Sequence, residues 1–371
     1  MNVLFVTMDG GGNVPPMLGV ARAVADRGEQ VRIVGHECLR REVEHAGLPF
    51  LAYPTARPWD SCREQSPLRW VPMFNDANIG ADVRRLCERD RPDVAVVDCM
   101  LLPALQAVQD AAVPHAVFSH TLRDYLNGAH RLGAGTAAWL YGHRINRLWN
   151  SADLNIVATV ARLDPESRRP QPDNVRWVGA VVDAREPDRS AGPAQVLVSM
   201  STNGFRGQRR TLARVIEALA TLPVDAVVTT GGVVEPAALP SAPNVDVREY
   251  ADHGELMPAC SLLVGHGGHA TTFRALAHGI PTLIMPASGL SDQPLIGRAI
   301  AAAGAGLTLR RSASVESIRR SIITLLVEPG WADAAAVVGA EIRASNAARR
   351  AAQLLTGLAS PWAGASRTAP R

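Results

Sequence analysis

Short apolar runs rich in β-branched residues alternate with amphipathic stretches along the first half of the chain. Met17, Leu18 and Ala21 share one face of a helical pattern, and Gly28 ends it. Apolar strands that alternate with such helices are typical of a parallel sheet covered on both faces. The pattern therefore predicts a doubly wound α/β domain. Its expected strands are residues 3–7, 30–35, 93–98, 115–120 and 154–160.

The alternation stops at residues 184–194, where charged residues surround Pro187, Gly192 and Pro193, and then restarts. Such a break predicts a linker between two Rossmann-like domains, residues 1–183 and residues 195–358. Open α/β sheets bind ligands outside the carboxyl ends of their strands, so two facing domains predict an interdomain cleft. The expected strands of the second domain are residues 196–200, 225–232, 244–250, 261–268 and 281–286. One last helix is expected from Trp331 to Leu358, followed by a frayed tail, residues 359–371.

Composition excludes several classes of protein. The chain is 47% hydrophobic, and its 38 basic and 35 acidic residues are interspersed, so no basic stripe predicts nucleic-acid binding. Five cysteines without a Cys-x-x-Cys pair argue against a disulfide framework and a zinc site, and favour a reducing cytoplasm. Neither a signal peptide nor an apolar run of ~20 residues is evident, so we expect no membrane segment and a cytoplasmic protein.

The strongest local motif lies at residues 262–286. A predicted strand ends at Gly265, His266, Gly267 and Gly268, and a helix follows from about Ala270. Glycines allow close approach of a ligand, and the free N–H groups of a helix start favour an anion such as a diphosphate. His266 and Thr271 would add side-chain donors. The alternative is that the glycines only form a tight turn.

Two polar residues stand at the start of the next predicted helix. Asp292 and Gln293 offer a carboxylate and an amide, which together suit neighbouring sugar hydroxyls. The alternative for the aspartate is a simple helix cap.

These motifs resemble those of family 1 glycosyltransferases of the GT-B fold, in particular the bacterial enzymes that glycosylate antibiotics, macrolides and other natural products. The resemblance implies that His266, Gly267, Gly268 and Thr271 hold the diphosphate of a TDP- or UDP-sugar together with Thr202. It also implies that Asp292 and Gln293 bind the hexose and that Tyr250 and Ala251 lie against the nucleotide base. Two positions depart from the family pattern: Ala270 replaces a glycine, and residues 251–253 replace Val-Pro-Gln. The segments that carry the resemblance are "QVLVSMST", "VVTTGG" and residues 242–294.

The amino half fits the family's opening of strand, loop and proline-led helix less closely. When Gly12 and Pro16 are aligned with that opening, Asn13 stands where the family keeps a catalytic histidine or, in a related group, an aspartate. An amide can orient an acceptor but cannot take its proton near neutral pH. Asp98 matches the family's partner of that histidine, and we expect burial to raise its pKa and make it the base.

His120 is the next candidate for the base, and Asp9 and Asp124 are rivals that also stand near strand ends. Alternatively no strong base is needed, because the acceptor is an amine, an acidic phenol or a carbon nucleophile.

Aromatic residues gather in two segments that could wall a pocket for a large apolar or aromatic aglycone. Aromatics at helical spacing are more often core, which is the alternative for the second segment. The first segment holds Trp59, Trp70, Met73 and Phe74, and the second holds Trp139, Tyr141 and Trp149.

The sequence thus predicts an inverting glycosyltransferase that moves a sugar from a nucleotide sugar to a small-molecule acceptor. No Asp-x-Asp pair is present, so neither a metal nor a cofactor is expected, and the chain could form a homodimer. A catalytically inactive sugar-nucleotide-binding partner protein and a nucleotide-sugar epimerase are the alternatives. A dinucleotide oxidoreductase is suggested only by the glycines at 10–12, which lack the Gly-x-Gly-x-x-Gly spacing.

Overall fold

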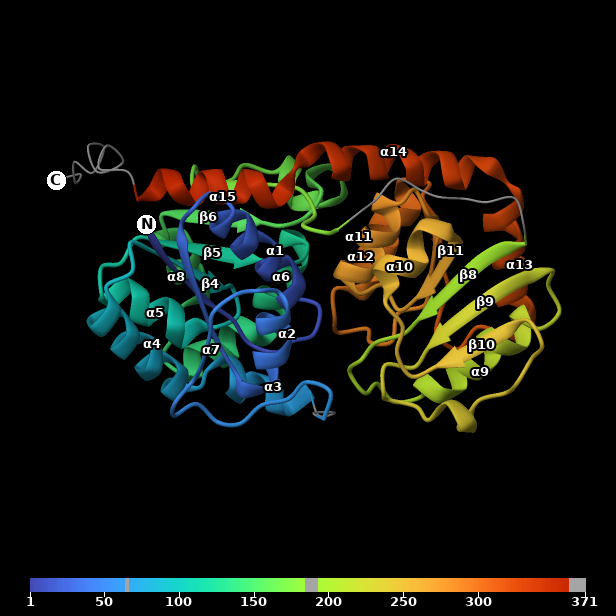
Figure 1. The fold of residues 1–371 in the computed structure, drawn as a ribbon, viewed down its shortest axis with the longest axis horizontal. Coiled ribbons are helices and arrows are strands. Elements are labelled where there is room, and N and C mark those ends of the chain that lie inside the picture. The colour runs from blue at the N-terminus through green and yellow to red at the C-terminus, as the bar shows by residue number, and fades with distance from the viewer. Residues whose placement is uncertain (64–66, 184–192, 360–371) are drawn as a thin grey trace. The chain divides into compact units, whose positions relative to one another are not determined.

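The computed structural model describes residues 1–63, 67–183 and 193–359 (Figure 1). The structure divides into two compact units. Unit 1 comprises Met1–Asp60, most of the following chain as far as Val181, and the end of the chain from Asn346 onward. Unit 2 comprises mainly Val182–Ser345. Most of the predicted linker, residues 184–192, and the predicted tail from residue 360 lie outside the described residues.

Unit 1 is built on a parallel seven-stranded sheet in the order β3-β2-β1-β4-β5-β6-β7. Its strands are β1 (Asn2–Val6), β2 (Gln30–Gly35), β3 (Phe50–Ala52), β4 (Val94–Asp98), β5 (His115–Ser119), β6 (Leu154–Val157) and β7 (Val175–Trp177). Its helices are α1 (Val14–Ala25), α2 (Arg40–His45), α3 (Pro67–Phe74), α4 (Ala77–Asp90), α5 (Leu102–Asp110), α6 (Arg123–Ala129), α7 (Gly135–Leu140), α8 (Ile145–Ser151) and α15 (Ala347–Leu358).

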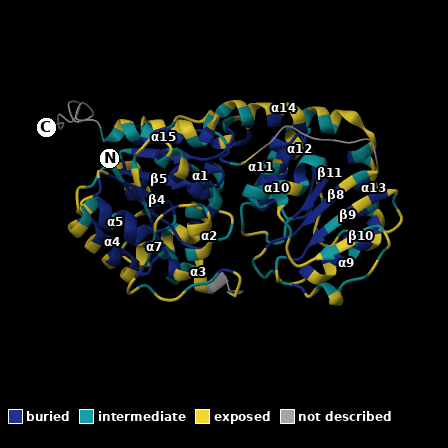
Figure 2. Cartoon of the chain, viewed as in Figure 1, coloured by how far each residue is buried: buried dark blue, intermediate teal, exposed yellow. Residues whose placement is uncertain are grey.

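Successive side chains of each central strand point to opposite faces of the sheet and pack in different hydrophobic cores. Val3 and Phe5 of β1 pack with α1 on one face of the sheet, and Leu4 and Val6 pack with α4 and α5 on the other. This two-sided burial explains why the strand reads as an unbroken apolar run. The buried central strands are dark blue in Figure 2.

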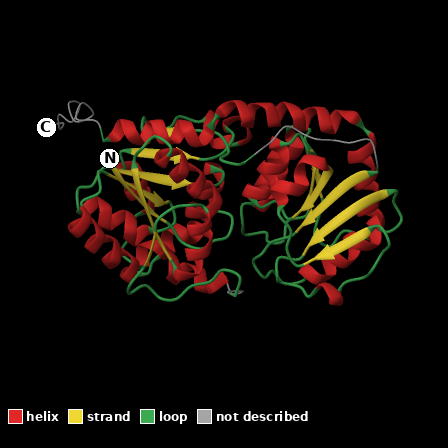
Figure 3. Cartoon of the chain, viewed as in Figure 1, coloured by secondary structure: helices red, strands yellow, loops and turns green. Residues whose placement is uncertain are grey.

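Unit 2 repeats this plan with a parallel six-stranded sheet in the order β10-β9-β8-β11-β12-β13 (Figure 3). Val196 and Val198 of β8 pack with the helices α9 and α13, while Leu197 faces the other layer, which includes α11. Its strands are β8 (Ala194–Ser199), β9 (Val224–Thr229), β10 (Val245–Arg248), β11 (Cys260–Gly265), β12 (Thr282–Ile284) and β13 (Gly306–Thr308). Its helices are α9 (Gln208–Leu219), α10 (His253–Leu256), α11 (His269–Ala277), α12 (Gln293–Ala302), α13 (Val315–Val327) and α14 (Pro329–Ser345).

The predicted doubly wound sheets are confirmed, but three strands were missed. β3, β7 and β13 have only three residues each and, unlike the equally short β12, are not fully buried, so they lack a continuous apolar run. They lie at or next to the edges of their sheets.

The end of the chain differs from the prediction. The single helix expected over 331–358 is two helices, because Asn346 adopts a left-handed backbone conformation with φ 46° between α14 and α15. α15 belongs to unit 1, so the second domain ends near Ser345 and not at residue 358. In Figure 1 the red α15 lies beside the blue α1, and Ala351 and Leu355 join the core of unit 1.

Removing the anchor of α15 is therefore expected to weaken unit 1. The Leu355 side chain is completely buried, and Leu355→Ala should cost about 2–5 kcal/mol because the cavity cannot close fully. Hydrogen exchange of the β1 amides measures this loss in unit 1 alone. Gln353→Ala, an exposed position on the same helix, is the matched control. Equal protection in both variants would show that α15 does not contribute to this core.

Among the described residues, no single helix has the length and apolar character needed to cross a membrane. One pair, Val315–Val327 with Pro329–Leu358, reaches that length and composition only when its parts are combined across a 70° bend. Both parts contribute buried residues, including Ile318 and Ile322 in unit 2 and Leu355 in unit 1.

Candidate functional site

In unit 1, three of the predicted site residues meet at the carboxyl ends of adjacent strands. Asn13 follows β1 and stands at the start of α1, Asp98 ends β4, and His120 follows β5. β1, β4 and β5 are neighbours in the sheet, and this edge of an α/β sheet is where ligands bind.

Asn13 is almost fully buried, with 1% of its surface exposed. Its Nδ2 donates to Asp98 Oδ2 at 2.9 Å and to the Met8 carbonyl at 3.0 Å. Its Oδ1 accepts the N–H of Gly10 at 2.9 Å. Both amide hydrogens are thus used within unit 1. Asn13 orders the glycine loop and Asp98, and leaves no hydrogen to orient an acceptor.

Asp98 is completely buried and both of its carboxylate oxygens are engaged. Oδ1 accepts the N–H of Met100 at 3.0 Å, and Oδ2 lies between Asn13 and His120, whose Nδ1 is 3.4 Å away. Burial raises the pKa of Asp98, but the neighbouring His120 and the hydrogen bonds from Met100 and Asn13 outweigh it and lower the pKa. The expectation of a raised pKa is therefore wrong. Asp98 is ionised and does not reach the surface of the site.

His120 is the member of this group that reaches solvent, with 16% of its side chain exposed. Its Nδ1 faces the Asp98 carboxylate, which favours the tautomer with a hydrogen on Nδ1. Nε2 is then the nitrogen able to accept a proton. An imidazole held by a buried carboxylate is the usual arrangement of a general base.

Cys99 lies beside this pair. The potential ligand atoms of Asp98, Cys99 and His120 lie within 4.8 Å of one another, the one such group found among the described residues. Burial raises the pKa of the Cys99 thiol well above its ordinary value, and a protonated thiol is a poor metal ligand.

The two rival carboxylates have structural contacts. Asp9 Oδ1 accepts the N–H of Gly11 at 3.2 Å, so this side chain stabilises the glycine loop. Asp124 lies at the start of α6, 3.3 Å from Nη1 of Arg169.

Of the aromatic segments, the first lies beside the glycine loop. Trp59 donates its indole N–H to the Asp9 carbonyl at 2.8 Å and meets Trp70 edge-on, with ring centroids 4.9 Å apart. Trp70 in turn contacts Phe74. The second segment is divided: Trp149 is core, and Trp139 and Tyr141 are exposed.

The contacts of Asn13 predict a pH-dependent effect of Asn13→Asp. The new carboxylate would replace a donor 2.9 Å from Asp98 Oδ2, and we expect a loss of about 1–3 kcal/mol in the free energy of unfolding near pH 8. One carboxyl of the pair would have a pKa raised in the folded state. The folded state would then bind more protons, so stability should recover toward about pH 5. Thermal unfolding measures this, and a loss that is the same at both pH values would contradict the interpretation.

In unit 2, the glycine turn joins β11 to α11, as the motif predicted. Gly267 has φ 88°, and a Cβ there would lie 2.8 Å from the Ile284 side chain. A Cβ on Gly268 would lie 2.5 Å from Nε2 of His266. Gly267 therefore requires glycine, and a side chain on Gly268 would displace the His266 ring. No side chain caps α11 and no acidic residue lies in its first turn, so its N–H groups are available to an anion.

The His266 imidazole is neutral at physiological pH. Burial lowers its pKa to about 4, against a hydrogen bond with the Ser199 backbone that raises it. Its Nδ1 is buried without a hydrogen-bond partner in the described structure.

The other predicted donor residues follow strands of the same sheet. Thr271 lies in the first turn of α11, and Thr202 is exposed after β8. Tyr250, which is 79% exposed, and Ala251 follow β10. All of these residues therefore lie at the carboxyl edge of the unit 2 sheet.

Asp292 and Gln293 begin α12 and are not equivalent. Asp292 occupies the cap position, yet its side chain makes no capping hydrogen bond. Gln293 is buried, and its Oε1 accepts the N–H groups of Ala287 and Ser288 at 2.8 and 3.2 Å. Its oxygen therefore shapes the loop before α12, and its Nε2 is the group left for a ligand.

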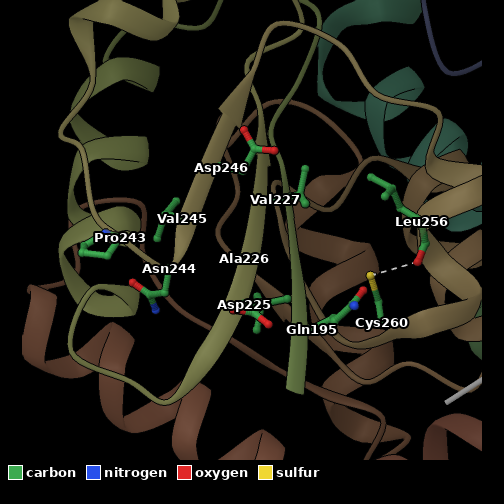
Figure 4. A pocket seen from close by; sticks show the side chains of 11 residues that line it. Gln195, Asp225, Ala226, Val227, Pro243, Asn244, Val245, Asp246, Leu256 and Cys260 are labelled. Carbon is green, nitrogen blue, oxygen red and sulfur yellow. Dashed lines mark hydrogen bonds between the residues drawn. The ribbon is translucent and has the colours of Figure 1, made fainter. Parts of the chain in front are cut away.

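A pocket of about 390 Å³ lies at the opposite end of this sheet (Figure 4). It is lined by the first residues of three strands, among them Gln195, Asp225 and Val245. Cys260 also lines it and donates its thiol hydrogen to the Leu256 carbonyl at 3.2 Å. Because it lies at the amino ends of the strands, this pocket is separate from the predicted donor residues.

Comparison with known proteins shows which proteins this chain is similar to. Residues 213–358 match the family of the C-terminal domain of erythromycin biosynthesis protein CIII-like proteins. A 4'-demethylrebeccamycin synthase of Lentzea aerocolonigenes is 30% identical over 221 residues, which cover 57% of this chain and 51% of that protein. The chain spans about half the length of such curated relatives.

Two solved structures share the fold of the whole chain. The glycotransferase of kitacinnamycin superposes with a TM-score of 0.80 at 21% identity, covering 96% of this chain and 98% of that one. The glycosyltransferase VinC, solved in complex with DTDP, has a TM-score of 0.70 at 20% identity and covers 97% and 99%. The GT-B fold and the resemblance predicted from the sequence are thus confirmed.

Proposed function

We propose that this chain, which has the GT-B fold and resembles the bacterial natural-product glycosyltransferases of family 1, is itself an inverting glycosyltransferase. It transfers a sugar from a nucleotide sugar to a small-molecule acceptor. The observation that carries the proposal is the glycine turn at the start of α11, where the uncapped N–H groups of the helix start form a site for an anion.

The donor binds to unit 2 through that turn. The helix start, His266 and Thr271 hold the diphosphate, with Thr202 contributing from the next loop. As the bond to the anomeric carbon breaks, these dipoles stabilise the charge that develops on the leaving diphosphate. No metal ligand is required for this role. VinC holds DTDP, and a dTDP- or UDP-sugar is the donor proposed here.

The hexose lies against the start of α12. The Asp292 carboxylate, which does not cap the helix, accepts hydrogen bonds from sugar hydroxyls, and Gln293 contributes its Nε2. Tyr250 offers a largely exposed ring after β10 for the nucleotide base.

His120 activates the acceptor from unit 1. Its Nε2 removes the proton of the attacking hydroxyl while Asp98, held ionised, fixes the ring and stabilises the imidazolium. In this proposal the general base follows β5, the strand after the one that Asp98 ends, and does not stand at the position of Asn13. The cluster of Trp59, Trp70 and Phe74 beside the glycine loop favours an apolar or aromatic acceptor.

Incubation of the purified chain with a panel of nucleotide sugars and aromatic acceptors tests the proposal. We expect mass spectrometry to detect the acceptor plus one sugar residue, with hydroxyl acceptors among the products. Nucleotide binding without transfer to any acceptor would instead support a sugar-nucleotide-binding partner protein. Conversion of the donor into its epimer would support an epimerase.

A further inference from the structure

A second anion-binding arrangement is found in unit 2, at the start of α9. A pocket of about 710 Å³ is lined by five arginines, and no carboxylate is among its lining residues in the described structure. We call it the arginine pocket. Its arginines are Arg206, Arg209, Arg210, Arg214 and Arg311.

These arginines converge from segments far apart in the sequence. Arg206 lies in the loop after β8, Arg209 and Arg210 in the first turn of α9, and Arg311 in the loop after β13. Side-chain hydrogen bonds hold the loops together: Arg311 Nη1 donates to the carbonyl of Arg206, in the loop after β8, at 2.9 Å and to that of Ala287, in the loop after β12, at 3.1 Å. The pocket is therefore built from ordered tertiary contacts.

The positive charge of the pocket is not neutralised within the described part of the chain. None of the five guanidinium groups forms a salt bridge there, and Arg214 has a buried Nε without a hydrogen-bond partner. Arginines that gather without carboxylates repel one another, so an external anion would lower the free energy of this arrangement.

Helix α9 adds to the positive electrostatic potential of the arginine pocket. α9 has 12 residues, begins after Gly207 without a side-chain cap, and has no acidic residue in its first turn. The residues of its first turn, Gln208 to Thr211, line the pocket, so the positive end of the helix dipole lies beside the arginines. Cations are unfavourable at the amino end of a helix. An anionic ligand would offset the repulsion between the arginines and the positive end of the helix dipole.

The arginine pocket is separate from the proposed donor site. Neither the glycine turn before α11 nor Thr271 lines it. The two sites share the loop after β8, which contains Thr202 on the donor side and Arg206 in the pocket.

We propose that the arginine pocket is a second phosphate site, which binds a compact anion with two or more phosphoryl groups. Guanidinium groups form paired hydrogen bonds with phosphate oxygens, and several arginines around one pocket match a diphosphate better than a single charge. The ligand is inorganic pyrophosphate or the diphosphate of a free nucleotide. This inference does not depend on the reaction proposed above.

Calorimetric titration of the full chain with inorganic pyrophosphate at low ionic strength tests the proposal. We expect saturable binding that weakens at least about tenfold in the double variant Arg209→Gln/Arg210→Gln, because charge-assisted hydrogen bonds are lost. The control is Arg349→Gln/Arg350→Gln, an exposed pair in the first turn of α15, which should leave the affinity unchanged.

The variant His266→Ala distinguishes the two sites. Pyrophosphate affinity that is kept in His266→Ala but lost in Arg209→Gln/Arg210→Gln supports a separate pocket. A second UDP-binding event, beyond the one that His266→Ala weakens, identifies the nucleotide as the source if it is lost in Arg209→Gln/Arg210→Gln. Absence of saturable binding would overturn the proposal. So would loss in His266→Ala alone, an equal loss in the α15 control, or binding to anionic lipid vesicles in place of pyrophosphate.

Discussion

Replacing His120 by alanine is expected to lower the rate of sugar transfer to a hydroxyl acceptor by about 10²- to 10⁴-fold, the usual contribution of a general base. The reason is geometric: His120 is the partly exposed member of a pair whose Asp98 is buried and fully hydrogen-bonded. Initial rates at saturating donor measure the effect, and nucleotide affinity should not change. In the wild type, activity should fall on acidification, because an imidazolium cannot accept a proton.

Two further variants separate this role from a structural one. Asp98→Asn should also reduce the rate strongly, and the double variant with His120→Ala should be little worse than His120→Ala alone, because the two residues act as a unit. Asp124→Asn, whose carboxylate pairs with Arg169, should retain activity. Near-normal transfer by His120→Ala with an alcohol acceptor would contradict the assignment.

The second large effect is expected at the donor site. His266→Ala should reduce kcat/KM by about 10²- to 10³-fold, the loss typical when one preorganised donor to a developing anion is removed. Thr271→Val should have a smaller effect in the same direction. Because the pKa of His266 is about 4, its neutral form acts at any pH above about 6, so the loss should be nearly constant from there upward.

Donor affinity provides the independent measurement. Calorimetric titration with UDP or dTDP should show weaker binding in His266→Ala, while the exposed control His45→Ala behaves as the wild type. Unchanged affinity and rate in His266→Ala would mean that the half-buried imidazole only supports the turn.

Much of the fold could be predicted because long, doubly buried strands such as Val94–Asp98 leave a continuous apolar signal. The break at Asn346 could not, because the residues on both sides of it are good helix formers. What assigns α15 to unit 1 is the packing of Ala351 and Leu355 into that core, and tertiary packing is not visible in a local pattern.

The candidate site could likewise be predicted only in part. Sequence placed Asn13, Asp98 and His120 at strand ends, and parallel pairing brings them together. It could not give the ionisation of Asp98, which depends on the N–H of Met100 and on the direction of the His120 ring. The arginine pocket was missed because Arg311, which contacts Arg214 and Arg206, lies 97 and 105 positions further along the chain, and no motif connects the two segments.

Proton NMR tests the proposed base-assisted sugar transfer most directly. The wild-type chain is incubated with an α-linked UDP- or dTDP-hexose and an aromatic alcohol. We expect the anomeric signal of the donor to be replaced by that of a β-linked glycoside, and only when the acceptor is present. A product that retains the α configuration, release of free sugar alone, or epimerised donor would contradict the account.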